Sequence, residues 1–329
     1  MSANLQTILS PISADMQSLN DVIRSRLSSE VALINQISAY IIEAGGKRIR
    51  PALLLLTGQA ISNGTPLKHH LDMAAVVEFI HTATLLHDDV VDESHLRRGR
   101  ATANAAFGNA ASVLVGDFLY SRAFQMMVAP NDIRIMEILA DATNTIAEGE
   151  VLQLMNMHDP DVNEARYMQV IHFKTGKLFE ASSALGALLA KATPEQYAAA
   201  QAYGKHIGAT FQLVDDILDY TASAEQMGKN AGDDLREGKP TLPLIYLLDH
   251  GTSAQQSLIR SAIEQAEELP EDLFQQVYEA IINSDAIKYT EAAALREAQL
   301  ARESLNCFPK NAATQSLIDL CDYSLKRSS

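Results

Sequence analysis

The sequence predicts an all-α fold built as one large domain. Apolar residues recur at helical spacing through most of the 329-residue chain. No run of alternating apolar and polar residues lies between hairpin turns, so strand signals are nearly absent. No low-complexity linker or change in composition divides the chain, and 47% apolar residues are enough for a sizeable core. We therefore expect residues 1–329 to form a single helical bundle.

Glycine, proline and polar residues divide this domain into its expected helices. Pro11 interrupts the first helix, Gly45-Gly46 ends the second, and Pro51 is expected at the first position of the third. The expected helical segments are residues 4–28, 30–44, 51–62, the apolar stretch that ends at Asp88, 111–127, 131–157, 162–192 and 194–220. Four shorter helices are expected to follow the polar loop EQMGKNAGDDLREGKPTLP, with breaks near Gly251, Pro270, Ser284 and Pro309.

Composition excludes several classes of function. The net charge of −15 argues against nucleic acid as the main partner. Cys307 and Cys321 form neither a disulfide framework nor a zinc signature, which fits a reducing compartment. The N-terminus does not resemble a signal peptide, and no apolar run is long enough to span a membrane. We expect a soluble, cytoplasmic protein, which can still act on an apolar substrate or hand an apolar product to a membrane.

Two acidic clusters of the form DDxxD each end a long apolar helix. They are Asp88, Asp89 and Asp92 in DDVVD, and Asp215, Asp216 and Asp219 in DDILD. Carboxylates four positions apart lie on one helix face and repel each other, and a cation between them relieves this repulsion. Carboxylates that leave room for water and phosphate oxygens suit Mg²⁺. A solvated helix end explains either cluster alone, but the pair favours a magnesium-bridged diphosphate at the mouth of an apolar cavity.

A basic segment precedes the first cluster. In GGKRIRP, Gly45 and Gly46 allow backbone N–H groups to converge on an anion, and Lys47 and Arg50 add positive charge. An ordinary helix end explains this segment equally well, because the helix dipole favours basic residues there. The segment RRGR, which follows the first cluster, serves either charge balance or diphosphate binding.

Other polar residues interrupt an apolar helix or lie in the loop after the second cluster. They are His81, Lys174, Thr175, Gln212, Lys229 and Lys239. A lone histidine on an apolar helix face is usually a core residue, so His81 carries little weight by itself. The loop after the second cluster is a natural place for a lid.

Five motifs, in order, resemble those of the trans-isoprenyl diphosphate synthases. They are GGKRIRP, LLHDDVVDESHLRRG, FKTGKL, FQLVDDILD and GDDLREGKPTLP. More narrowly, the set resembles the bacterial long-chain polyprenyl synthases of the octaprenyl diphosphate type. The resemblance implies the all-α prenyl synthase fold, with a central apolar cavity, working as a homodimer. It also implies Mg²⁺-dependent, sequential head-to-tail addition of isopentenyl diphosphate to an allylic diphosphate such as farnesyl diphosphate.

The same resemblance implies a role for each candidate residue. The isopentenyl diphosphate contacts would be Lys47, Arg50, His81 and Arg98. The allylic diphosphate contacts would be Arg97, Lys174, Thr175, Gln212, Lys229 and Lys239. The Mg²⁺ ligands would be Asp88, Asp92, Asp215 and Asp219, and the residues acting in catalysis would be Asp88, Asp89, Asp92, Asp215, Asp216 and Lys174.

The residue types agree with an ionisation mechanism. Metal and basic groups would stabilise the leaving diphosphate, so that the allylic C–O bond breaks. The double bond of isopentenyl diphosphate would attack the carbocation, and in this family the released diphosphate takes up the proton. No strong side-chain base is needed near the cation, and none is evident. A dry apolar wall would protect the cation from water.

Small residues just before the first cluster favour a long product. Ala83 and Thr84 stand where bulky aromatic residues stop chain growth early in this family. Overall resemblance favours an octaprenyl product, which would supply a quinone side chain. Phe124, Met126 and Met127 are candidates for the floor of the chain tunnel, although Phe and Met at helical spacing are more often plain core. Growth would stop for steric reasons, because each added unit gains burial.

Three other classes of protein are weighed against this interpretation. A terpene cyclase or head-to-head synthase would not need the GGKRIRP segment and the arginine pair. A non-catalytic subunit of a heteromeric synthase typically lacks an aspartate motif, and this chain has both. A di-iron bundle needs two Glu-x-x-His motifs, and we find only Glu78 with His81.

Overall fold

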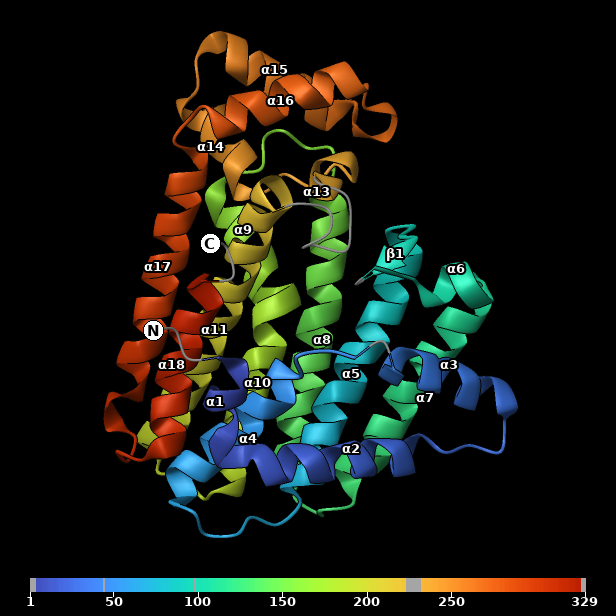
Figure 1. Cartoon of the computed structure of the whole chain (residues 1–329), viewed down its shortest axis with the longest axis vertical. Coiled ribbons are helices and arrows are strands. Elements are labelled where there is room, and N and C mark those ends of the chain that lie inside the picture. Colours follow the sequence, from blue (N-terminus) through green and yellow to red (C-terminus); the bar gives the residue numbers. More distant parts are fainter. Residues whose placement is uncertain (1–3, 44, 98, 223–231, 327–329) are drawn as a thin grey trace.

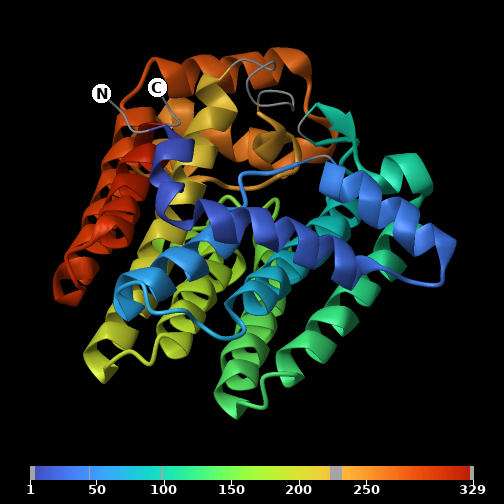
Figure 2. The ribbon, with the colours of Figure 1, turned by 60° about the horizontal axis from the view of Figure 1, so that its bottom comes forward.

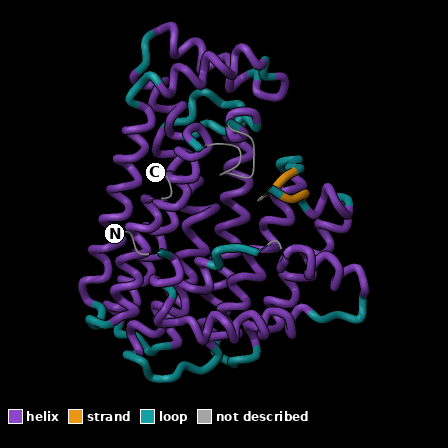
Figure 3. The backbone as a smooth tube through the Cα atoms, in the orientation of Figure 1, coloured by secondary structure: helices purple, strands orange, loops and turns teal. Residues whose placement is uncertain are grey.

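Long helices running side by side form the body of the molecule, as the sequence predicts (Figure 1). The computed structural model describes residues 4–43, 45–97, 99–222 and 232–326. In these ranges the only strands are β1 (Leu96–Arg97) and β2 (Arg100–Ala101), which pair as a short antiparallel ladder. Figure 3 shows how little of the backbone they account for. The all-α prediction is confirmed.

The helices have the following bounds. The first half of the chain contains α1 (Leu5–Ile8), η1 (Ser10–Ile12), α2 (Ser13–Leu27), α3 (Ala32–Glu43), α4 (Ile49–Ser62), α5 (His70–Val91), α6 (Ala103–Phe107), α7 (Asn109–Val128) and α8 (Ile133–Asn156). The second half contains α9 (Glu164–Val170), η2 (Ile171–Gly176), α10 (Lys177–Leu189), α11 (Pro194–Thr221), α13 (Asp233–Arg236), α14 (Leu242–His250), α15 (Ser253–Glu264), η3 (Ala266–Glu268), α16 (Glu271–Ile282), α17 (Ala286–Ser304), η4 (Leu305–Cys307) and α18 (Ala312–Lys326).

Side-chain caps explain where two of the long helices, α8 and α11, start. Thr193 and Gln196 form a capping box at the start of α11, where Pro194 needs no N–H partner. The side chain of Asp132 accepts the Arg134 N–H at the start of α8. These contacts satisfy backbone N–H groups that have no partner within the helix.

The start of α4 differs from the expected one. Pro51 was expected at the first helical position, but α4 begins at Ile49. Arg48 takes a left-handed conformation with φ of 48° and turns the chain into the helix two residues earlier. Pro51 still lies in the first turn, where its missing N–H costs no hydrogen bond.

Four further expectations need correction. Residues 97–109 lie outside the expected helices, but they contain α6 and most of the β1–β2 hairpin, and the later polar loop contains α13. The segment 162–192, expected as one α-helix, is divided by the π-helix η2. The expected breaks near Gly251, Pro270, Ser284 and Pro309 separate the five helices α14 to α18, not four.

Packing places α5, α8, η2 and α11 around a common interior. Helix α5 packs against α4 and α7, and α10 packs against α4, α8 and α11. The π-helix η2 contacts both α8 and α11. At Gly208 on α11 an added Cβ would lie 2.7 Å from the Cα of Gly176, so this close approach requires a glycine at position 208. The main apolar core joins α2, α4, α5, α7, α10, α11 and α18.

The two ends of the long helices are covered differently. Figure 2 shows α2 crossing in front of the long helices at one end. At the other end α14, α15 and α16 form a cap in Figure 1, with an apolar cluster of its own that includes Leu247, Ile259 and Val277. None of the helices in the described ranges is both long and apolar enough to cross a membrane.

Candidate active site

A cavity of about 820 Å³ opens between α5, α8, η2 and α11, beside the segment 232–241. Most of the residues that the sequence singles out line it. They are Lys47, Arg50, His81, Thr84, Asp88, Asp92, Arg97, Lys174, Thr175, Gln212, Asp215, Asp216 and Lys239. Motifs from five separate stretches of the chain therefore meet in one place.

Five predicted residues are not among those lining the cavity. Asp89 and Asp219 are buried and bind other parts of the protein. Ala83, on α5, is fully buried in the main apolar core. Arg98 and Lys229 lie outside the described residues.

In the first cluster, Asp88 and Asp92 face the cavity and each binds a lysine. Lys174 of η2 lies 3.5 Å from Asp88, and Lys239 lies 3.0 Å from Asp92. Burial raises the pKa of Asp88, Lys174 opposes that effect, and the neighbouring charge of Asp92 adds to it. Burial lowers the pKa of Lys239, but the carboxylates of Asp92 and Glu237 outweigh it, and the net pKa is raised. Burial likewise lowers the pKa of Lys174, but the carboxylates of Asp88 and Glu150 outweigh it, so both ammonium groups stay charged.

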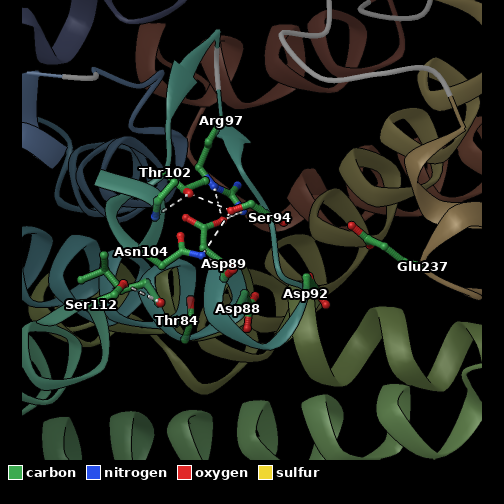
Figure 4. A network of polar contacts seen from close by, with 12 residues as sticks. Thr84, Asp88, Asp89, Asp92, Ser94, Arg97, Thr102, Asn104, Ser112 and Glu237 are labelled. Carbon is green, nitrogen blue, oxygen red and sulfur yellow. Dashed lines mark hydrogen bonds and ion pairs between the residues drawn. The ribbon is translucent and has the colours of Figure 1, made fainter. Parts of the chain in front are cut away.

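The third aspartate of this cluster, Asp89, has a structural task. Its Oδ1 accepts hydrogen bonds from Arg97 Nε at 2.9 Å and Arg97 Nη2 at 2.7 Å. Its carbonyl oxygen accepts from Asn104 Nδ2 at 3.0 Å and from the Ser94 N–H at 3.0 Å. Figure 4 shows this group around Asp89, with Asp88 outside it. Asp89 thus fixes the hairpin and holds Arg97 at the cavity wall, and a direct part in catalysis stays a prediction.

The second cluster is bound mainly by neutral donors. The Asp216 carboxylate accepts from the Tyr167 hydroxyl at 2.5 Å and from Gln212 Nε2 at 2.8 Å. The Thr175 hydroxyl donates to Gln212 Oε1 at 3.0 Å, which continues the chain of contacts to η2. Burial, followed by the charge of Asp234, raises the pKa of Asp216 well above its usual range. Asp216 therefore joins α9, η2 and α11 at the cavity wall.

Asp219, the last residue of the second cluster, is fully buried. Its Oδ2 accepts the Asp234 N–H at 3.3 Å, and its carbonyl oxygen accepts the Gly232 N–H at 2.9 Å. Asp219 thereby fixes the start of α13, and Asp234 lines the cavity instead. As a metal ligand Asp219 is poorly placed, whereas Asp215 lines the cavity directly.

Sequence reasoning missed Asp234, Glu150 and Tyr167. Asp234 lies within the motif GDDLREGKPTLP, and its neighbour Asp233 makes an acidic pair with it. That pair could have indicated a further acidic residue at the site. Glu150 of α8 lies 2.5 Å from Lys174, and burial raises its pKa to about 7, with Lys174 opposing and Asp88 adding to the shift. No local sequence pattern distinguishes Glu150 or Tyr167, because their partners come from distant segments.

A basic group lines another part of the cavity. Arg50 Nη1 lies 3.1 Å from His81 Nε2, and the Arg50 guanidinium stacks 4.4 Å from the centre of the Phe179 ring. Lys47 lies 5.5 Å from the centre of the Tyr323 ring, which α18 supplies. His81 is therefore not the plain core residue that its position alone suggested.

The carboxylates fit a metal that arrives with a diphosphate better than a preformed metal cage. Among the described residues no group of three or more His, Cys, Asp or Glu side chains is placed to hold a metal ion. Mg²⁺ usually keeps several waters and binds one or two carboxylates together with substrate phosphates. Asp88 and Asp92 suit that mode. In this structure the ammonium groups of Lys174 and Lys239 neutralise them, and a cation such as Mg²⁺ could take the place of those groups.

The predicted tunnel residues are placed unequally. Thr84 lines the cavity, and its hydroxyl donates to the His81 carbonyl oxygen at 2.8 Å. Met126 and Met127 are buried in the core, as their alternative interpretation held. Phe124 is 42% exposed in the single chain, and its assignment to the floor of the tunnel stays a prediction.

Comparison with known proteins gives consistent matches. The pattern of the family described as Polyprenyl synthetase matches residues 31–281. The chain is 50% identical to the octaprenyl diphosphate synthase of Escherichia coli (strain K12), over 98% of this chain and 99% of that protein. It is 44% identical to an all-trans-nonaprenyl-diphosphate synthase (geranyl-diphosphate specific) of Rhodobacter capsulatus, over 98% of each.

A solved structure is also similar. The polyprenyl synthase from Caulobacter crescentus CB15, complexed with calcium and isoprenyl diphosphate, superposes with a TM-score of 0.95 at 42% identity. The match covers 100% of this chain and 99% of that one.

Proposed function

The chain belongs to the polyprenyl synthetase family, and we propose that it is a long-chain trans-polyprenyl diphosphate synthase that makes octaprenyl diphosphate. It adds isopentenyl diphosphate units head to tail to an allylic diphosphate such as farnesyl diphosphate. The similarity to octaprenyl diphosphate synthases over nearly the whole chain supports this product. The product would serve as a quinone side chain and, being apolar, would pass to a membrane from a cytoplasmic enzyme.

One observation carries the proposal. The cavity has an acidic part with two paired lysines and a separate basic part built from Lys47, Arg50 and His81. The first suits a metal-bound diphosphate and the second suits a diphosphate without metal. An enzyme that only ionises one diphosphate has no use for the second part.

In the acidic part, Asp88, Asp92 and Asp215 are proposed to hold Mg²⁺, with Asp234 in place of Asp219. When bound, Mg²⁺ would neutralise the diphosphate oxygens and make the diphosphate a better leaving group. Lys174 then leaves Asp88, Lys239 leaves Asp92, and both ammonium groups bind the allylic diphosphate. Their charges stabilise the negative charge that develops as the C–O bond breaks.

In the basic part, Lys47, Arg50 and His81 bind the diphosphate of isopentenyl diphosphate. This fixes its double bond beside the allylic carbon, and the attack forms the new C–C bond. The proton lost from the adduct passes to the released diphosphate, so no side-chain base is required. Phe179 and Phe211 line the reaction space and exclude water from the carbocation.

We also propose a homodimer joined through α7 and α8. Leu114, Phe124 and Val128 lie on the exposed side of α7, and Leu154 and Met155 are exposed on α8. Within α7, which is described in full, the only charged side chain among the exposed positions is Asp117. Such apolar surface is typical of a protein interface. Light scattering should give a dimer mass, Leu114→Asp should give a monomer, and the control Leu295→Asp on α17 should not.

The experiment that tests the function is a product analysis. Purified protein is incubated with farnesyl diphosphate, labelled isopentenyl diphosphate and Mg²⁺, and the products are separated by chromatography. We expect octaprenyl diphosphate. Conversion of farnesyl diphosphate without any need for isopentenyl diphosphate would instead indicate a cyclase, and inactivity of the pure protein would indicate a subunit that needs a partner.

A further inference from the structure

Two carboxylates, not one, hold the Lys174 ammonium group. Glu150 of α8 lies 2.5 Å from Lys174 Nζ, closer than Asp88 at 3.5 Å. All three side chains are largely buried, at 30%, 17% and 19% exposure for Glu150, Asp88 and Lys174. The attraction between charges is stronger in such surroundings than at the surface, because water screens it only partly.

Backbone packing brings Glu150 to this place. A Cβ at the preceding residue, Gly149, would lie 2.6 Å from the backbone nitrogen of Lys174 and 2.8 Å from Phe173 Cβ. The backbone of α8 therefore lies directly against the π-helix η2 at the level of Lys174. Single π-turns often mark functional sites, since the extra residue redirects the side chains that follow.

The two carboxylates differ in what substrate binding would do to them. Under the proposed function Asp88 becomes a metal ligand, and its charge is then shared with the metal. Glu150 lies on another helix and outside both DDxxD motifs, so it can keep its contact with Lys174. Without Glu150, Lys174 would have Asp88 as its remaining close carboxylate and would compete with the metal for it.

We propose that Glu150, carried against η2 by Gly149, is a positioning residue that holds Lys174 ready for the allylic diphosphate and keeps it from occupying Asp88. The inference rests on the proposed function. It predicts that removing the Glu150 charge affects the acidic part of the cavity and spares the basic part.

The test compares Glu150→Gln with the wild-type enzyme under steady-state conditions. We expect kcat to fall roughly tenfold and the Mg²⁺ concentration for half-maximal activity to rise several-fold. The KM for isopentenyl diphosphate should stay unchanged, and Glu150→Asp should recover part of the loss. The matched control is Glu148→Gln on the exposed side of α8, which should behave as wild type.

A double-mutant cycle separates positioning from other roles. In a Lys174→Ala background, Glu150→Gln should cause no further loss, because Glu150 acts through Lys174. Losses that add would overturn the inference and point to a direct metal contact or a structural role. Thermal melting of each variant checks that the fold is retained.

Failure of the inference can be told apart from failure of the proposed function. An active wild-type enzyme with an equally active Glu150→Gln variant overturns the inference alone. If the wild-type protein elongates nothing, the proposed function is overturned. Calorimetric binding of farnesyl thiodiphosphate with Mg²⁺ then decides the inference: weaker binding to Glu150→Gln than to Glu148→Gln supports it, and equal binding overturns it.

Discussion

The ends of α5 and α11 carry the same DDxxD spacing but use it differently. On α5, Asp88 and Asp92 face the cavity and bind lysines from other elements. On α11, Asp216 binds the neutral donors Tyr167 and Gln212, and Asp219 is fully buried. The first cluster therefore offers charges that can exchange partners, whereas most of the second cluster holds the cavity wall together.

This difference has a general lesson about paired motifs. A carboxylate bound by ammonium groups can release them to a metal and a diphosphate without leaving a buried charge alone. A carboxylate bound by a hydroxyl, an amide and backbone N–H groups is part of the scaffold, and moving it would break several contacts at once. Spacing alone does not distinguish the two situations.

The largest expected effect comes from the first cluster, whose carboxylates can exchange their lysine partners for a metal. Asp88→Asn should lower kcat by about 10²–10³-fold, the scale seen when one group that stabilises transition-state charge is removed. Its melting temperature should not fall, because burial already disfavours the charged form of Asp88. Steady-state kinetics and thermal melting check both expectations, and activity above a tenth of the wild-type value would break the comparison.

A change at the second cluster should lower the free energy of unfolding more than it lowers activity. Tyr167→Phe removes the hydroxyl that donates to the buried Asp216 carboxylate, and an unsatisfied buried acceptor costs about 1–3 kcal/mol. Denaturant unfolding should show this loss, together with a smaller fall in kcat than Asp88→Asn causes. A variant as stable as the wild type would show that Asp216 does not depend on Tyr167.

Below the clusters, α5 is also expected to meet the growing chain. Thr84 lines the cavity and Ala83 does not, so Thr84→Tyr should shorten the product while the first additions proceed. Ala83→Tyr should also shorten it if the chain passes that far, but at some cost in stability, because Ala83 is fully buried. Chromatography of the products checks this. An unchanged product from Thr84→Tyr would show that this part of α5 does not set the length of the product.

The smallest expected effect is a pH dependence of stability from Glu150. Its pKa in the folded protein is about 7, raised from 4.5 mainly by burial. A raised pKa means that the folded state binds the proton more tightly, so this contribution to stability is complete below pH 4.5 and is lost as the pH rises through about 7. The unfolding free energy of the wild type relative to Glu150→Gln should fall over that range, and a flat difference would contradict the assignment.

Much of this arrangement could be predicted from the sequence. Helical periodicity and breaker residues predicted the all-α class and the extents of α8 and α11 closely. The motifs predicted which stretches meet at the cavity, because each carries residues whose chemistry suits a diphosphate. These features depend on local patterns, which a single sequence displays directly.

The rest depended on contacts between distant segments. Asp89 and Asp216 were expected to act in catalysis, but Arg97 and Tyr167 bind them in the folded chain. The role of Glu150 depends on the close approach of α8 to η2 at Gly149, which no helical pattern reveals. The π-turn η2 also escaped prediction, because helical periodicity does not distinguish a π-turn from the α-helices on either side of it.

The central claim is that both parts of the cavity are used in one reaction. The most direct test is the ratio of isopentenyl diphosphate consumed to farnesyl diphosphate consumed by the purified protein in Mg²⁺. We predict the ratio required to convert farnesyl diphosphate into octaprenyl diphosphate. In Asp88→Asn, the consumption of both substrates should fall strongly. Consumption of farnesyl diphosphate with no incorporation of isopentenyl diphosphate would contradict the account.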